Sequence, residues 1–284
     1  GTAAITGTVT DQTGGGIEKA EVTAKLGAGT RRTWTDAQGR MHLFVVATGW
    51  GGWAASRVLH LQQSSASQNL AELAFEPARV LPLSWLWNTS FLVRNAVLPL
   101  QDGGAVLPVH FELGLKYPAA VRLDASGNFL GLTRMSNRAY MLQPTLLPQS
   151  PTQWVALMRD ERHGGKVTAV RTDDGGAHWA DLPDLPLGNP DSAIAGYVLG
   201  PQQMLLAHNP TPEGRARLDL SRSADGLQWT LQQTLAQGRG EAEFSYPALA
   251  WADGALWISY TVDRATLSWQ RFAPAAPGTP GGQP

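Results

Sequence analysis

The chain has 284 residues, of which 43% are apolar, and a formal net charge of −1. Its 22 basic and 23 acidic residues are scattered along the chain, so neither nucleic acid nor an anionic membrane surface is expected as a partner. There is no cysteine, which excludes disulfides and thiolate metal sites, and no run of 18 apolar residues, so no membrane-spanning helix is expected. The 31 Gly, 19 Pro and 11 Trp favour a turn-rich all-β protein.

The first 48 residues are predicted to form a small β-sandwich-like segment. Residues 5–17 and 20–26 indicate two strands, and residues 33–46 indicate a hairpin whose turn runs from Asp36 to Gly39. The succession Gly-x-Val-x-Asp, Ala-x-Val and Thr-Asp-Ala-x-Gly resembles the carboxypeptidase regulatory-like module, which implies a spacer or adhesive domain. Residues 56–62 fit either the end of this segment, which would then extend to 78, or a strand of the region that follows.

From residue 79 to about 272 a strand–turn–strand pattern is repeated. The four copies span residues 95–112, 142–160, 193–211 and 245–263. Their turns centre near Gly103, Pro151, Pro201 and Asp253, at intervals of 48, 50 and 52 residues. A repeat of this period is typical of a radial or stacked array, and paired strands favour propeller blades. The sequence therefore predicts a β-propeller over 49–272, followed by a disordered Pro- and Gly-rich tail over 273–284.

A second motif lies between the repeated strand pairs. Thr172-Asp-Asp-Gly-Gly-Ala-His-Trp179 fits the pattern Ser/Thr-x-Asp-x-Gly-x-x-Trp, residues 223–229 form a version one residue shorter, and residues 124–129 form a degenerate one. In such a turn the carboxylate and the hydroxyl accept backbone amides, glycine takes a positive φ, and tryptophan packs beside the hairpin. We interpret these acidic residues as structural, on hairpins away from a binding face.

These boxes resemble the Asp boxes of the sialidase-like propeller family, and the resemblance covers about two thirds of the chain. It implies an all-β, sialidase-type β-propeller with six blades. Four to five blades are recognisable in this sequence, so the fold is expected to be incomplete. Either the first 80 residues replace the missing blades, or the chain is a fragment or a fusion.

The resemblance also implies catalytic residues for the cleavage of an acidic sugar. Tyr246 matches the tyrosine nucleophile of the family, which departs from the usual carboxylate pair of glycosidases. Gln143 stands where the family has the glutamate that takes the proton of this tyrosine, and an amide is not a base near neutral pH. Glu112 or Glu243 is a possible replacement. No aspartate lies between residues 36 and 102, where the proton donor of the family is expected.

Arginines are expected to bind the sugar carboxylate, because a guanidinium offers two parallel donors. Arg159 matches the second arginine of the family, and Arg217 matches the third, with Arg215 as the competing choice. The first arginine has three candidates, which are Arg57, Arg79 and Arg94. Asn209 is a candidate for contacting sugar hydroxyls. The tryptophans Trp50, Trp85 and Trp87 either stack on a sugar or pack between blades.

The leading hypothesis is a glycoside hydrolase that releases terminal acidic sugars, such as sialic acid, from glycoconjugates. Two alternatives remain open: a glycan-binding propeller that has lost turnover, and a structural module that acts through protein contacts. The expected partner is a sialylated or other acidic-sugar glycan, with no cofactor and no metal, since the six histidines lack metal-site spacing. The oligomeric state is open. An extracellular or cell-envelope location is favoured, although no signal peptide is recognisable.

Overall fold

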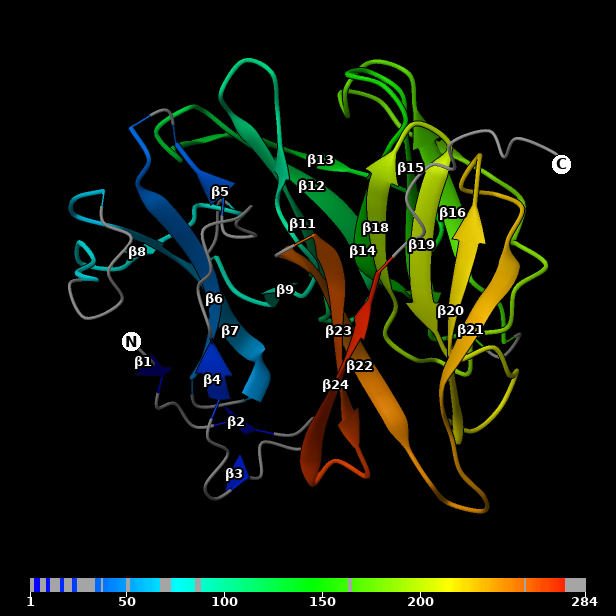
Figure 1. Cartoon of the computed structure of the whole chain (residues 1–284). Helices are drawn as coiled ribbons and strands as arrows, with labels where there is room; N and C mark the ends of the chain where they lie inside the picture. Colours follow the sequence, from blue (N-terminus) through cyan, green and yellow to red (C-terminus); the bar gives the residue numbers. More distant parts are fainter. Residues whose placement is uncertain are drawn as a thin grey trace, which may run out of the picture.

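A computed structural model describes residues 3–5, 9–10, 16–17, 22–24, 34–36, 38–49, 52–66, 73–84, 88–162, 165–252 and 254–273. All of the regular secondary structure in these residues is β, in 24 strands (Figure 1). No helix in this part of the chain is long and apolar enough to cross a membrane.

Two small sheets come from the start of the chain. The first pairs β1 (Ala3–Ile5) with β4 (Val22–Ala24), and the second pairs β2 (Val9–Thr10) with β3 (Gly16–Ile17). Both pairs are antiparallel.

Five larger antiparallel sheets follow, each formed by consecutive strands, and we call them blades 1 to 5. Blade 1 contains β5 (Trp34–Thr35), β6 (Met41–Gly49), β7 (Gly52–Gln62) and β8 (Arg79–Val80). Blade 2 contains β9 (Phe91–Val93), β10 (Leu98–Pro99), β11 (Ala105–Phe111), β12 (Tyr117–Leu123) and β13 (Phe129–Arg134). Blade 3 contains β14 (Met141–Pro148), β15 (Trp154–Asp160), β16 (Thr168–Thr172) and β17 (Ala180–Asp181). Blade 4 contains β18 (Ala195–Gly200), β19 (Gln203–His208), β20 (Arg217–Ser223) and β21 (Thr230–Gln237), and blade 5 contains β22 (Phe244–Ala252), β23 (Ala255–Val262) and β24 (Thr266–Phe272).

The blades follow one another around the molecule, from the blue blade 1 to the orange and red blade 5 (Figure 1). This is a five-bladed propeller arrangement, and it confirms the predicted all-β, incomplete propeller. The predicted hairpins are present between β10 and β11, β14 and β15, β18 and β19, and β22 and β23. Asp253, the predicted centre of the last turn, lies outside the described residues.

The hydrophobic core lies between successive blades, because alternate side chains of a strand point to opposite faces of its sheet. On β11, Leu107 and Val109 pack toward blade 1, whereas Val106 packs toward blade 3. Two further clusters join blades 3 and 4 and blades 4 and 5. Blades 2, 3 and 4 therefore each have a core cluster on both faces, which fixes the register of their strands and the direction in which the strand ends project.

The Asp-box turns have the bonding predicted from the sequence. Asp174 Oδ1 accepts the backbone amide of His178 at 2.9 Å, and the Thr172 hydroxyl accepts that of Gly176 at 3.0 Å. The backbone amide of His178, followed by the His178 ring and the Thr172 hydroxyl, lowers the pKa of Asp174 to about 2. The backbone amide of Gly175 bonds to Thr152, which places the box beside the β14–β15 hairpin.

The expected division of the chain at residue 48 remains a prediction. Blade 1 extends from Trp34 to Val80, so one sheet contains residues on both sides of that position. The predicted turn at Asp36 is present as the link between β5 and β6, where Asp36 accepts the backbone amide of Arg40 at 2.9 Å. The predicted disordered tail lies outside the described residues, except for residue 273.

Candidate active site

The inner strands of blades 3 and 5 are interrupted at equivalent points near their start. The pairing of β14 skips from Leu142 to Thr145, and the pairing of β22 skips from Ser245 to Ala248. Gln143 and Tyr246 occupy these bulges with φ values of 56° and 53°. A positive φ is rare outside glycine, and such strain is found mainly where a functional site needs a side chain held in a particular direction.

Both bulge residues end in a buried polar atom without a partner. Among the described residues, no hydrogen-bond partner is present for the Tyr246 hydroxyl or for Gln143 Oε1. Buried polar groups are nearly always paired in folded proteins, so an unpaired atom requires an explanation. Here the two atoms share one end of the propeller, where a polar ligand would satisfy them.

Arg94 of blade 2 contacts Tyr246 and the residue that follows it. It lies between β9 and β10, and its Nη2 donates to the carbonyl of Pro247 at 2.7 Å. Its guanidinium carbon is 5.8 Å from the centre of the Tyr246 ring. Burial lowers the pKa of Arg94 to about 10 and the positive charge of Arg159 also lowers it, while Tyr246 opposes the shift.

Arg159 is buried at the end of β15 and is held by an aspartate that the sequence analysis did not single out. Its Nε donates to Asp191 Oδ1 at 2.5 Å. Burial alone would lower the pKa of Arg159, but the hydrogen bond and the charge of Asp191 raise it overall. Tyr246 and Glu112 act in the same direction. Arg94 and Arg159 therefore form a positively charged centre beside the Tyr246 ring.

Glu112 follows β11 and is one of the two glutamates that the sequence analysis proposed as a base. Its Oε2 is 3.5 Å from Nε2 of His110, which is buried. Burial alone would raise the pKa of Glu112, but His110, Lys116 and Arg159 lower it overall, so Glu112 is ionised at neutral pH. Burial lowers the pKa of His110, and its Nδ1 has no partner among the described residues.

The third predicted arginine does not join this group. Arg217 donates from Nε to Asp219 Oδ1 at 2.9 Å and from Nη2 to the Thr234 hydroxyl at 3.3 Å, and so lies along blade 4. Its competitor Arg215 lies closer to the centre. It donates from Nη2 to the carbonyl of Asp191 at 2.7 Å and from Nη1 to Glu243 at 3.0 Å.

Asn209 is fully buried and ties the backbone together. Its Nδ2 donates to the carbonyls of Arg217 at 2.6 Å and Phe244 at 2.8 Å, which links blade 4 to the start of β22. Asn95 makes the same kind of link between blades 2 and 3. It donates to the carbonyls of Gln143 at 2.8 Å and Pro144 at 3.0 Å. The two amides thus hold the two bulges in place.

The remaining candidates lie elsewhere. Arg57 is exposed on β7, and Arg79 bonds to His60 in blade 1. Trp50, Trp85 and Trp87 fall outside the described residues.

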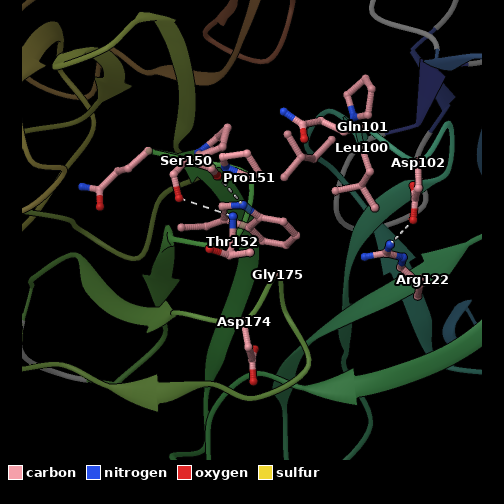
Figure 2. A pocket seen from close by; sticks show the side chains of 14 residues that line it. Leu100, Gln101, Asp102, Arg122, Ser150, Pro151, Thr152, Asp174 and Gly175 are labelled. Carbon is pink, nitrogen blue, oxygen red and sulfur yellow. Dashed lines mark hydrogen bonds and ion pairs between the residues drawn. The ribbon is translucent and has the colours of Figure 1, made fainter.

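A separate pocket of about 500 Å³ lies beside the β10–β11 and β14–β15 turns (Figure 2). The tips of the β10–β11 and β14–β15 hairpins form its walls, and an ion pair between Arg122 and Asp102 lies at one edge. None of the predicted site residues lines it. It lies at the far end of β14 from Gln143, beside the Asp-box residue Asp174.

Comparison with known proteins identifies the family and the fold of the chain. Residues 18–258 match the family described as BNR repeat-like domain. No curated protein matches the chain. Among solved structures, a mutant of the NanB sialidase from Streptococcus pneumoniae is 11% identical with a TM-score of 0.60, over 77% of this chain and 36% of that one. Trypanosoma rangeli sialidase in complex with the inhibitor DANA is 15% identical with a TM-score of 0.63, over 83% and 44%.

A Hadza microbial sialidase is also similar, with 15% identity and a TM-score of 0.53, over 92% of this chain and 71% of that one. The chain thus spans less than half the length of the NanB and Trypanosoma rangeli sialidases. At these identities the likeness concerns the fold. The family match covers most of the chain and includes its Asp boxes and blades, so the chain belongs to the BNR repeat-like domain family and has a sialidase-like β-propeller fold.

Proposed function

We propose that the chain is a sialidase-like glycoside hydrolase that releases a terminal acidic sugar from a glycoconjugate. The observation that carries the proposal is the contact of Arg94 from blade 2 with the Tyr246 ring of blade 5, with the buried Arg159 of blade 3 close enough to act electrostatically on both. Arg94 has no carboxylate partner among the described residues, so an anionic ligand would supply the missing negative charge. Within the described part of the chain the Nη groups of Arg159 make no hydrogen bond, so they offer two donors to a carboxylate.

In the proposed reaction the Tyr246 oxygen attacks the anomeric carbon, and the bond from that carbon to the leaving oxygen breaks. The phenolic proton passes to ionised Glu112 through bound water, and the leaving oxygen takes a proton from solvent. Water then attacks the same carbon, which breaks its bond to Tyr246, and the phenol regains a proton. The uncharged phenol suits a substrate whose carboxylate would repel an anionic nucleophile.

A second candidate is a site that binds acidic sugars without cleaving them. It is favoured by the identity of Gln143 and by the Tyr246 hydroxyl, for which the described residues supply no carboxylate neighbour within bonding distance. Without a base that touches the phenol, the attack step would be slow, whereas the arginines would still hold the ligand.

The test is hydrolysis of 4-methylumbelliferyl N-acetylneuraminic acid by the wild type and by Tyr246→Phe. We expect cleavage by the wild type and a loss of about a thousandfold or more in the variant, because the nucleophile is removed. Tyr140→Phe is the matched control, since Tyr140 is an exposed tyrosine outside the site.

Arg159→Lys should weaken binding of free N-acetylneuraminic acid, because lysine cannot form the two parallel bonds. Binding without any cleavage would select the second candidate. A wild type that neither cleaves nor binds the sugar would reject both.

A further inference from the structure

Asp191 holds two arginines, one from blade 3 and one from just before blade 4. Its carboxylate accepts Arg159 Nε of blade 3 at 2.5 Å, and its backbone carbonyl accepts Arg215 Nη2, just before blade 4, at 2.7 Å. It does this with a φ of 51°, in the loop that leads into β18. One strained residue therefore sets the spacing of two positive charges.

The loop that carries Asp191 is fixed by buried polar side chains on both sides. Asn189 Oδ1 accepts the backbone amide of Ser192 at 2.9 Å, and Asn189 Nδ2 donates to the Ser192 carbonyl at 2.8 Å. The Ser192 hydroxyl donates to Asn209 Oδ1, and Asn209 in turn holds the start of β22. Asn189, Ser192 and Asn209 are all fully buried. A closed network of this kind positions the aspartate rigidly.

The nitrogen through which Arg159 contacts Asp191 decides which of its donors remain for a ligand. A guanidinium binds a carboxylate either through Nε and one terminal nitrogen, or through both terminal nitrogens. Asp191 occupies Nε, and no bond to the terminal nitrogens is recorded in the described part of the chain. Arg215, by contrast, is engaged through both of its terminal nitrogens, with Asp191 and Glu243.

We infer that Asp191 is a positioning residue that turns the two terminal nitrogens of Arg159 toward the ligand, so that the substrate carboxylate is bound end-on. Arg215 holds the backbone carbonyl of Asp191 and does not bind the substrate carboxylate. This inference rests on the proposed function for the identity of the ligand. The role of Asp191 in orienting Arg159 rests on the contacts alone and does not depend on the proposed function.

The test compares Asp191→Asn and Asp191→Ala with the wild type. Asparagine keeps an acceptor oxygen and tolerates positive φ, whereas alanine loses the acceptor and is strained there. Calorimetry with N-acetylneuraminic acid should show affinity about tenfold or more weaker for the alanine variant, and a smaller loss for asparagine. Asp184→Asn is the control, because that carboxylate is similarly exposed and paired with Arg138 and Arg162.

A purely structural role would lower the unfolding temperature in step with affinity, so both are measured. The midpoint of Asp191→Asn should stay at the wild-type value while its affinity falls. Equal affinity in all three proteins, or a loss of affinity that tracks unfolding, would overturn the inference.

A second readout needs no ligand. In a ¹H–¹⁵N spectrum of arginine side chains, the Nε–H signal of Arg159, assigned by its loss in Arg159→Lys, should exchange slowly in the wild type and rapidly in Asp191→Ala. If the sugar does not bind to the wild type, the proposed function fails and this spectrum alone decides the role of Asp191. An exchange rate that Asp191→Ala leaves unchanged would overturn it.

Discussion

Two polar clusters in this molecule differ in whether their buried side-chain atoms are paired. The first, which we call the histidine chain, is formed by Asp36, His42, His60 and Arg79 in blade 1. Arg79 Nη2 lies 3.3 Å from His60 Nδ1, His60 Nε2 lies 2.8 Å from His42 Nδ1, and His42 Nε2 lies 3.2 Å from Asp36 Oδ2. Because arginine can only donate, Nδ1 of His60 is an acceptor and its proton is on Nε2. His60 Nε2 therefore donates to His42 Nδ1, and His42 Nε2 donates to Asp36.

The second cluster, around Tyr246, is incomplete. Four buried side-chain atoms lack a partner among the described residues, and three of them belong to Tyr246, Gln143 and His110. The fourth is Nδ1 of His208 on β19. A fully paired cluster of this kind holds the strands of one blade together, whereas an unpaired one at strained positions indicates a place for a ligand.

The largest effect is expected where the histidine chain meets blade 2. A Cβ at Gly127 would lie 2.5 Å from His42 Nδ1 and 2.7 Å from His60 Cε1. Gly127→Ala should therefore lower the free energy of unfolding by about 3 kcal/mol or more, from positive-φ strain and overpacking together.

Gly114→Ala is the matched control for this variant, because Gly114 also has a positive φ but has open space around it. It should cost only about 1 kcal/mol. Chemical denaturation measures both. Equal losses in the two variants would mean that the histidine chain does not pack against blade 2 as described.

The next effect concerns pH. Burial lowers the pKa of His60 to about 4, and the interactions with His42 and Arg79 lower it further. Because the folded-state pKa lies below the unfolded value, the unfolded chain binds more protons as pH falls, and stability is lost between about pH 6.5 and pH 4. His60→Gln removes this contribution, so its loss of stability between pH 7 and pH 5 should be smaller than that of the wild type by about 2 kcal/mol.

His178→Gln is the control for this experiment, because the His178 side chain is 91% exposed and lies in an Asp-box turn. Urea titrations at the two pH values provide the data. The same pH dependence in His60→Gln and the wild type would contradict the assignment of a neutral His60.

The incomplete cluster should respond in the opposite way, with a loss of binding and little loss of stability. Arg94→Met removes a partly buried charge that has no carboxylate partner among the described residues. We expect affinity for N-acetylneuraminic acid to fall about tenfold or more, with the free energy of unfolding unchanged or raised. Arg171→Met, at an exposed arginine of blade 3, should change neither. A clear loss of stability with unchanged affinity would show that Arg94 serves the fold alone.

Much of the fold could be predicted because its signals are local. Each Asp box carries its own bonding partners within eight residues, and the hairpins recur at a near-constant interval. Arg159 and Tyr246 could be proposed for one site because a propeller brings the same end of each inner strand to a common axis. Their actual neighbours depend on contacts between blades, which leave no local pattern.

Asp191 shows what the sequence could not reveal. Its partner Arg159 lies 32 residues earlier, and the only local signal is the polar turn of Asn189 to Ser192 ahead of β18. The sequence also could not decide between Arg215 and Arg217, because the two lie two residues apart on the same face at the start of β20. Asp219, two residues along the same face, pairs with Arg217 and leaves Arg215 to the centre.

The claim that unpaired atoms indicate the ligand site is tested most directly by the unfolding free energy of Tyr246→Phe. Phenylalanine keeps the ring against Arg94 and removes only the hydroxyl, for which the described residues supply no partner. The account predicts a free energy equal to that of the wild type or higher by up to about 1 kcal/mol, because a buried unpaired polar group is removed. A decrease of more than about 1 kcal/mol would mean that the hydroxyl already has a partner in the folded chain, and it would contradict the account.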